Sequence, residues 1–479
     1  MAVNTIVIEK QGYGVGLINT FRLASLSGLV FVTLARAAVA ESLSSALSEA
    51  YHKNPTLNAA RAGQRATDEA VPQALAGWRP IISAQAVVKQ SFTDTSNTTN
   101  PTVFSQGHNY ITPTEEDYTI QLRQPIFNGF RTVESTKVAE AQVKAGQQQL
   151  LATEQTVLLN GIQAYLDVIR DRRTLQLRQQ NLVVLQDQLK ASQARFKAGE
   201  LTRTDVAQSE AGGATAQAAL AGTLAQLKAS EATYEQIIGH KPGKLASAPA
   251  AKAPASLEQA MEIAHRTNPN ILAAAQVVDQ TEHTVGVVYS ALLPQAEVSG
   301  TYLYTAQQNG IREGQTSRSD LTVQGTLTVP IYDGGLTFSQ VRAAKQRASQ
   351  SRISVIDTTR QVRQAVAANW ASYTSSKQAV SSSSTGVSAS RTAFDGVKQE
   401  YQVGSRSTID VLNAEQTLVN AQISQVALQH DLILASYRLQ ASIGHLTARY
   451  LHLGTIYDPL RNYYDVRDKW IGTDAKVLQ

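Results

Sequence analysis

Phe196-Lys197-Ala198-Gly199-Glu200-Leu201-Thr202-Arg203-Thr204-Asp205-Val206 returns 205 positions later as Tyr401-Gln402-Val403-Gly404-Ser405-Arg406-Ser407-Thr408-Ile409-Asp410-Val411. In each copy a glycine follows a long polar and leucine-bearing run, where a helix C-terminus needs a residue that tolerates a positive φ. Thr202 and Asp205, like Ser407 and Asp410, then have the spacing of a capping box, in which a hydroxyl and an acid satisfy free amides of a first helical turn. Each copy therefore predicts the tip of a hairpin of two helices.

The duplication extends over most of the chain. Asn54-Pro55 returns as Asn268-Pro269 after 214 positions, and the run that begins at Pro125 returns at Pro330 after 205, so the first copy has nine extra residues (214 minus 205). They fall in a polar loop at about 91–117. We predict a first repeat at 41–240, with a strand pair at about 81–125 and a hairpin at about 130–240 whose tip is near 199. A linker at 241–255 leads to a second repeat at 256–445, with a strand pair at about 295–330 and a hairpin at about 335–445 whose tip is near 404. A tail at 446–479 follows. The tail forms either short helices packed outside the long ones or a loosely held end.

The N-terminus has the features of an export signal. Lys10 and Arg22 precede a short apolar run at 23–34, and Ala38-Val39-Ala40 has the small-x-small form of a cleavage site. We predict a signal peptide at 1–40; an uncleaved anchor is the alternative, which the short apolar core disfavours. The chain has no cysteine, which suits an exported protein without disulfides.

Two segments in each repeat alternate between apolar and polar residues. Leu321, Val323 and Leu327 interleave with threonine and glutamine, for example. A lipid-facing, water-lined barrel has this pattern, and so does a half-buried sheet of a soluble protein. If these strands line a barrel, four of them are too few to close it, and the protein must be an oligomer.

The hairpin arms predict long helices. No proline occurs between Pro125 and Pro242 or between Pro330 and Pro459. Apolar residues recur every seventh position in a column of Val168, Leu175, Leu182, Leu189 and Phe196. Residues 130–197 would span about 100 Å at about 1.5 Å per residue. A cytosolic coiled coil would share these arms, but it would leave the export signal and the strand pairs unexplained.

Composition excludes several other classes of protein. The net charge is +5 without a cluster of basic residues, so we expect no nucleic-acid partner. The eight histidines form no His-x-x-x-His pair, and no Gly-x-Ser-x-Gly or phosphate-binding loop occurs. We therefore predict no catalytic residues, no metal site, no cofactor and no enzymatic activity.

The features that carry a family resemblance are the signal peptide, the repeated Asn-Pro starts, the Pro-Ile-Phe/Tyr-x-Gly strand ends, the proline-free arms and the run from Val403 to Leu412. In these features the chain resembles the TolC family of outer-membrane channels, especially the alphaproteobacterial BepC-like members. The resemblance implies an α+β fold, with a trimeric twelve-stranded outer-membrane β-barrel (four strands per protomer) continued by a long α-helical coiled-coil periplasmic tunnel. It implies a passive homotrimeric duct in the bacterial outer membrane, multi-pass and with a large periplasmic portion. Such ducts export drugs, toxins or proteins as part of tripartite efflux pumps or type I secretion systems. They work with a periplasmic adaptor and an inner-membrane transporter, either an RND pump or an ABC secretion ATPase.

The resemblance also implies roles for residues at the tips. Tyr401 and Arg406 would lie opposite Thr204 and Asp205 and hold the second hairpin against the first, which closes the periplasmic entrance. Asp410 would face the channel axis as a ring of carboxylates, and Asn413 stands where the family often has a second acid, so we expect weaker cation binding. The adaptor would dock on tip residues Gly199, Glu200, Leu201, Gly404 and Ser405; Ala198-Gly199-Glu200 departs from the Val-Gly-Leu often found there.

Plainer interpretations of these residues remain open. Asp205 and Asp410 have a sufficient role as capping acids at a helix N-terminus, and Arg406 could be a solvated surface charge. Because Leu201 stands where the second copy has Arg406, the two tips are not equivalent, which favours a gating role for the second. The alternative function is a periplasmic coiled-coil adaptor or scaffold without a pore.

Overall fold

The computed structural model describes residues 40–95, 109–111, 114–308 and 315–474. The predicted signal peptide lies outside the described residues except for Ala40, as does most of the predicted polar loop. Among the helices that the structure describes, none is both long enough and apolar enough to cross a membrane.

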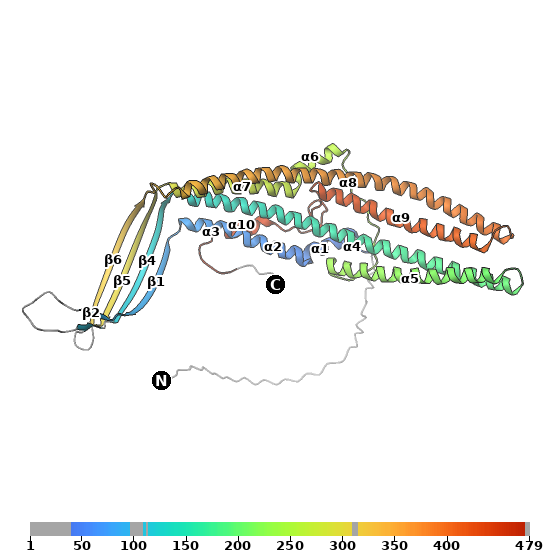
Figure 1. Ribbon diagram of the computed structural model, residues 1–479, viewed down its shortest axis with the longest axis horizontal. Coiled ribbons are helices and arrows are strands. Elements are labelled where there is room, and N and C mark those ends of the chain that lie inside the picture. The colour runs from blue at the N-terminus through green and yellow to red at the C-terminus, as the bar shows by residue number, and fades with distance from the viewer. Residues whose placement is uncertain (1–39, 96–108, 112–113, 309–314, 475–479) are drawn as a thin grey trace, which may run out of the picture. The chain divides into compact units, whose positions relative to one another are not determined.

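The two copies contain the same series of elements: short helices, two strands and a pair of long helices (Figure 1). The first copy comprises α1 (Leu43–Lys53), α2 (Pro55–Asp68), α3 (Ala70–Leu75), the 3-10 turn η1 (Ala76–Trp78), β1 (Ile81–Gln90), β4 (Thr114–Asn128), α4 (Arg131–Lys197) and α5 (Arg203–Ile238). The second comprises α6 (Leu257–Thr267), α7 (Pro269–Tyr289), the 3-10 turn η2 (Ser290–Leu292), β5 (Gln295–Gln308), β6 (Gln315–Thr328), α8 (Leu336–Gln402) and α9 (Thr408–Ser442). A short hairpin of β2 (Thr93–Thr95) and β3 (Asn109–Ile111), which the sequence did not predict, falls between β1 and β4.

The repeated Asn-Pro pair joins each short helix to the end of a long one. Asn54 caps α2 by accepting the amide of Thr56 at 3.0 Å, and its side-chain amide donates to the carbonyl of Ile237 at 3.0 Å. Asn268 caps α7 in the same way and donates to Ser442 O at 2.9 Å. The proline that follows suits the first helical position, where its missing amide costs nothing. One dipeptide thus starts a helix and fastens it to the hairpin's return arm.

The four main strands form one antiparallel sheet in the order β1-β4-β5-β6, so β1 and β6 are its edges. The register places apolar residues opposite one another, as in Ile82 with Leu122 and Tyr302 with Leu321. Because side chains alternate along a strand, one face collects most of the apolar residues and the other is mainly polar. The apolar face carries Ile82, Val88, Tyr118, Ile120, Leu122, Val298, Tyr302, Leu321, Val323 and Leu327, all of them exposed.

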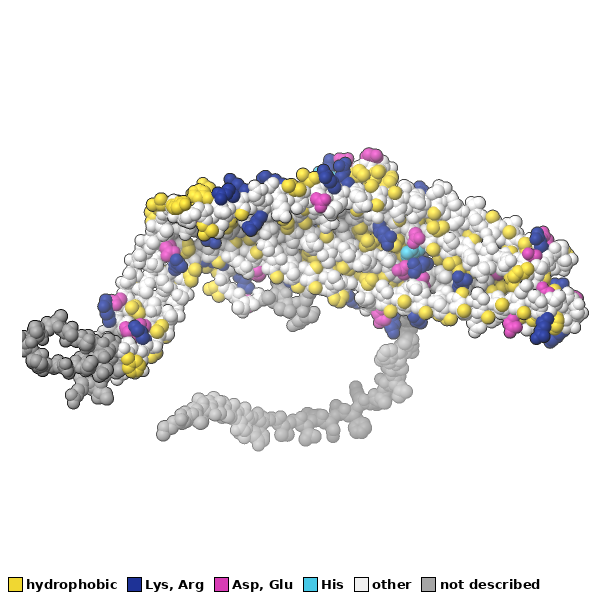
Figure 2. Space-filling model, viewed as in Figure 1, with side chains coloured by type: hydrophobic (Ala, Val, Ile, Leu, Met, Phe, Trp, Pro, Cys, Tyr) yellow, Lys and Arg dark blue, Asp and Glu magenta, His cyan; other side chains and the backbone are white. Residues whose placement is uncertain are grey.

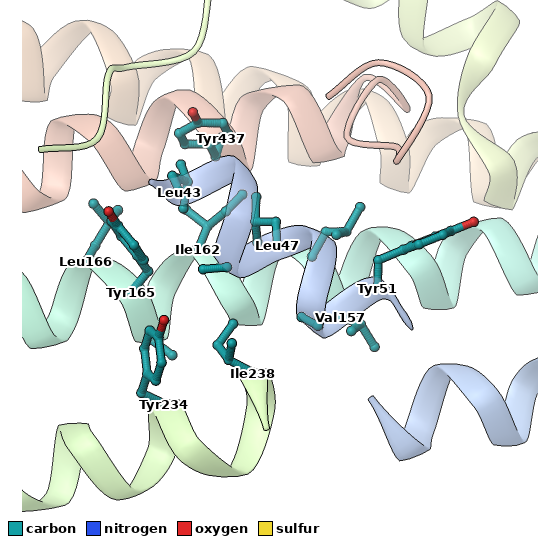
Figure 3. Close-up of a cluster of buried hydrophobic side chains, with 14 of the residues drawn as sticks. Leu43, Leu47, Tyr51, Val157, Ile162, Tyr165, Leu166, Tyr234, Ile238 and Tyr437 are labelled. Atoms are coloured by element: carbon teal, nitrogen blue, oxygen red, sulfur yellow. The ribbon is translucent and has the colours of Figure 1, made fainter. Parts of the chain in front are cut away.

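α4 and α8 are each 67 residues long, about 100 Å at about 1.5 Å per residue. The main core lies where α1 crosses α4 and α5 (Figure 3). Tyr165 and Tyr234 pack there with Leu47, Ile162 and Ile238, all fully buried. The Tyr165 hydroxyl lies within hydrogen-bonding distance of the carbonyl oxygens at Glu41 (2.8 Å) and Ala246 (2.7 Å). A smaller core around Leu439 and Ile443 serves the second copy.

The tail packs on the first copy. Leu446, Ala448 and Leu453 join the main core, and α10 (Pro459–Val466) lies on α2. There the Asn462 side-chain amide donates to the buried carboxylate of Asp68 at 2.8 Å. Of the two conformations considered for the tail, the structure therefore has the short packed helix, and the chain is described up to residue 474.

Candidate functional site

Each hairpin turns through a glycine in the left-handed region. Gly199 has φ +80° and Gly404 has φ +82°. In both, the amide that follows the glycine donates back to the helix: Glu200 N to Arg195 O at 2.9 Å, and Ser405 N to Glu400 O at 3.0 Å. This is the 6→1 bond of a Schellman motif, which satisfies carbonyls at the end of a helix.

Both return helices begin with a complete capping box. Thr202 Oγ1 accepts the Asp205 amide at 3.3 Å, and the Thr202 amide donates to Asp205 Oδ2 at 2.9 Å. Ser407 and Asp410 repeat the arrangement at 3.4 and 3.0 Å. The hydrogen bonds from Thr202 and from Ser407 hold the pKa of Asp205 and of Asp410 below the usual range for aspartate. Both acids therefore cap helices in addition to any role they have in gating.

The two hairpins touch through Tyr401. Its side chain is only 8% exposed, and the Arg195 guanidinium carbon lies 5.0 Å from its ring centroid, a cation–π contact between α4 and α8. The Tyr401 hydroxyl is 3.5 Å from Thr408 Oγ1. The nearby Thr408 hydroxyl adds to the Thr202 hydrogen bonds that lower the pKa of Asp205. The contact of Arg195 with Tyr401 thus joins the hairpins at their tips, and Thr408 of the second hairpin lies near Asp205 of the first.

Arg406 makes a different contact from the expected one. Within the described chain its ion pair is with Glu400, Nε to Oε2 at 2.7 Å, and both side chains are about half exposed. Thr204 is exposed and lies beside Asp205 without a contact to Arg406 in the structure. The pairing across the hairpins that the sequence analysis gave to Arg406 is therefore absent within one chain. Its role at the entrance stays a prediction.

The remaining predicted tip residues lie at the surface. Asp410 is half-buried, and Asn413 is exposed one turn further along α9. The expected docking residues are exposed apart from the half-buried Leu201: Gly199, Glu200, Gly404 and Ser405. Glu200 also pairs with Arg195, Nε to Oε2 at 2.9 Å.

Sequence reasoning missed three residues of this site: Arg195, Glu400 and Thr408. Each stands within six residues of a predicted one, but their partners could not be inferred from spacing alone. A cavity of about 400 Å³ lies beside them between α4, α8 and α9. It is lined in part by Tyr401, Val411 and Glu415, and burial raises the pKa of the Glu415 carboxyl.

The sequence profile of the family described as "Outer membrane efflux protein" matches residues 46–240 and 260–445, which are the two repeats. This chain belongs to that family.

Curated relatives and a solved structure agree with this membership. The chain is similar to the outer membrane efflux protein BepC of Brucella suis biovar 1, with 38% identity over 451 residues that cover 93% of this chain and 94% of that protein. It is also similar to the outer membrane protein TolC of Vibrio cholerae serotype O1, with 26% identity over 434 residues, 87% of this chain and 93% of that protein. The solved structure of the Campylobacter jejuni CmeC outer membrane channel shares the fold, with a TM-score of 0.73, 14% identity and coverage of 89% of both chains.

The predicted family, fold class and function are confirmed: the chain is an outer-membrane efflux protein with the fold of these channels. The relatives are channel and efflux proteins rather than enzymes. The alternative of an adaptor without a pore finds no support among them.

Proposed function

We propose that three copies of this chain close into a twelve-stranded barrel in the outer membrane and into a periplasmic tunnel of long helices. The observation that carries this proposal is the sheet itself, which has one apolar face, one polar face and two unpaired edges. Four strands cannot close, and open edges are avoided in lipid because each free amide or carbonyl there is costly. Pairing β1 of one chain with β6 of the next removes both edges and turns the apolar faces toward lipid.

Exposed apolar groups on the helices support the same assembly. Figure 2 shows hydrophobic side chains gathered where the strands meet the long helices. Ile331, Leu336 and Phe338 are among the exposed large residues of that region, and Ile353 and Ile356 continue along α8. Contiguous apolar surface of this kind marks an interface, and neighbouring copies would bury it.

The tips form the periplasmic entrance of the proposed duct. In the trimer Arg406, which extends from an exposed tip, would reach Thr204 and Asp205 of the neighbouring hairpin, while Tyr401 keeps its place beside Arg195. Asp410 and Asn413 would line the axis, and the exposed turns at Gly199 and Gly404 would receive a periplasmic adaptor. The adaptor and an inner-membrane transporter, either an RND pump or an ABC ATPase, would open the entrance, and drugs, toxins or proteins would leave through it passively.

Assembly and conductance test this proposal together. Protein extracted from the outer membrane in detergent should have the mass of three chains by native mass spectrometry and should conduct ions in a planar bilayer. A protein that remains monomeric, or a trimer that never conducts, contradicts a duct. Recovery in the soluble or inner-membrane fraction would instead favour the adaptor alternative.

A further inference from the structure

Aromatic residues mark the ends of the strands that adjoin the long helices. Trp78 lies three residues before β1, Phe130 two residues after β4, Tyr289 six residues before β5 and Tyr332 four residues after β6, and all four are exposed. Outer-membrane strands carry girdles of aromatic side chains at the two boundaries between lipid and water. We call these four residues the basal belt and take them to mark the periplasmic boundary of the membrane.

The C-terminal tail reaches this belt. Beyond α10, the carbonyl of Lys469 accepts a hydrogen bond from Arg79 Nη1 at 2.9 Å, and the Arg79 guanidinium carbon lies 4.8 Å from the centroid of the Trp470 ring. Arg79 stands between Trp78 of the belt and the first residues of β1. An ion pair with α4 also holds the segment, since Arg467 Nη2 lies 3.4 Å from Glu140 Oε1.

These contacts leave the apolar end of the tail uncovered. Trp470 is 66% exposed and Ile471 is 90% exposed, although the neighbouring polar groups are engaged. Trp470 thus packs against Arg79, the residue that follows Trp78 of the belt. An exposed tryptophan and isoleucine held in a fixed position indicate a surface that something apolar covers.

The distance of this segment from the start of β1, measured along the membrane normal, identifies that partner. Arg79 is two residues before the start of β1, which is about 7 Å at about 3.3 Å per extended residue. The headgroup region of a bilayer extends about 5–7 Å beyond the hydrocarbon on each side. A group at the level of Arg79 thus lies among headgroups if β1 begins at the hydrocarbon edge. Tryptophan favours this depth because its ring is apolar and its N–H is polar.

We propose that the C-terminal tail is a second membrane contact of each chain, in which Trp470 and Ile471 insert among the phospholipid headgroups of the periplasmic leaflet. The inference rests on the proposed function, because it needs the strands to lie in the outer membrane. Residues 459–474 carry three basic and three acidic side chains, so the contact depends on apolar burial and not on net charge. It holds α2, and through it the short helices of the first copy, at a fixed distance from the membrane.

Site-directed spin labelling of the whole protein tests the proposal, because the chain has no cysteine of its own. Single variants Ile471→Cys, Val323→Cys and Val403→Cys are labelled with a nitroxide and reconstituted in phosphatidylethanolamine–phosphatidylglycerol vesicles. Val323 lies on the apolar face of β6, and Val403 lies exposed at the second tip. We expect the label at 471 to collide with dissolved oxygen more and with a water-soluble nickel chelate less than the label at 403, though less markedly than the label at 323.

The two reference positions separate the possible failures. A label at 471 that is as accessible to nickel as the label at 403, while that at 323 is in lipid, overturns the tail contact and leaves the proposed duct intact. If the label at 323 is also in water, the strands are not in the membrane and both proposals fail.

Tryptophan fluorescence gives a second measurement with the native residue in place. The variant Trp78→Phe/Trp370→Phe keeps only Trp470, and Trp78→Phe/Trp470→Phe keeps only Trp370, which lies within α8 beside Tyr373. Lipids brominated near the headgroup should quench Trp470 and leave Trp370 unchanged, with little effect of salt. Equal emission of Trp470 in brominated and plain lipid overturns the proposal.

Discussion

The two hairpin tips have the same backbone conformation and differ in their side chains. Each turns through a left-handed glycine, closes a capping box and holds an ion pair across the turn. The ion pairs have opposite polarity: the basic partner precedes the turn in the first tip (Arg195 with Glu200) and follows it in the second (Glu400 with Arg406). The two copies therefore share what the backbone requires and differ in their exposed side chains.

Burial separates the tips further. Phe196 and Tyr401 are equivalent positions, yet Phe196 is 44% exposed and Tyr401 is 8% exposed. Tyr401 packs against Arg195 of the other hairpin, whereas Phe196 faces solvent in the single chain. Within one chain, the second tip thus supplies the aromatic group and the first supplies the cation that covers it.

Truncating these aromatic residues should have the largest effect. Tyr401→Ala removes a buried ring and both of its contacts, so we expect the free energy of opening at the tips to fall by about 3 kcal/mol. Phe196→Ala is the matched control and should cost less than about 1 kcal/mol, since its ring is already half in water. Hydrogen exchange of α5 and α9 amides near the tips measures both. Equal losses in the two variants would contradict the asymmetry.

Removing the caps should have a smaller and equal effect. Thr202→Ala and Ser407→Ala each delete the hydroxyl that accepts the amide three residues on, at a cost of about 1 kcal/mol. Hydrogen exchange in the first turns of α5 and α9 should rise by the same factor. Thr202→Ser and Ser407→Thr, which keep a hydroxyl, should stay close to the parent. A loss at one tip only would mean that the shared backbone does not stabilise both tips alike.

Acid should loosen both tips. The folded pKa of Asp205 and of Asp410 is lowered, so their contribution to stability is complete above the unfolded pKa of about 3.9. It is lost as the pH falls through the lower folded values. The mobility of a nitroxide at Val403→Cys should increase as the pH falls from about 5 to about 2.5. In Asp205→Asn/Asp410→Asn that change should disappear; its persistence would assign the transition to other groups.

Of the tip substitutions, replacing Arg406 should change the free energy of opening least. Its main expected effect is on single-channel conductance. Its pair with Glu400 is solvent-exposed, and exposed pairs contribute little. Arg406→Ala should leave the tip amides protected but raise single-channel conductance, as should Asp205→Ala. Leu201→Ala, at the equivalent position of the first tip, is the control for conductance. Parental conductance in both Arg406→Ala and Asp205→Ala would remove them from the gate.

Local features could be predicted from the sequence, and contacts across hairpins could not. The glycine turns and capping boxes depend on neighbours within six residues, and the two-faced sheet follows from alternation at positions such as Ile82 and Val323. Arg195 and Tyr401 are 206 positions apart (401 minus 195), and no periodicity relates them. Arg406 pairs within one chain with Glu400, six residues before it, and its predicted position opposite Thr204 and Asp205 stays a prediction.

The seven-residue column of α4 shows the same limit. Val168 is fully buried, but exposure increases along the column to Phe196. The spacing correctly marks one side of a helix, yet it does not say whether that side is covered by the same chain. The proposed neighbours in the trimer would provide the remaining cover.

The tail that lies on α2 has a consequence for the outside of the tunnel. Asp68 is buried under Asn462 in the first copy, whereas Glu282, its equivalent in the second, forms a surface ion pair with Arg352. A trimer would therefore present six outer surfaces, in which three covered by the tail alternate with three that carry the Glu282–Arg352 ion pair. A periplasmic protein that binds this outer surface would therefore find three equivalent sites on the trimer and not six.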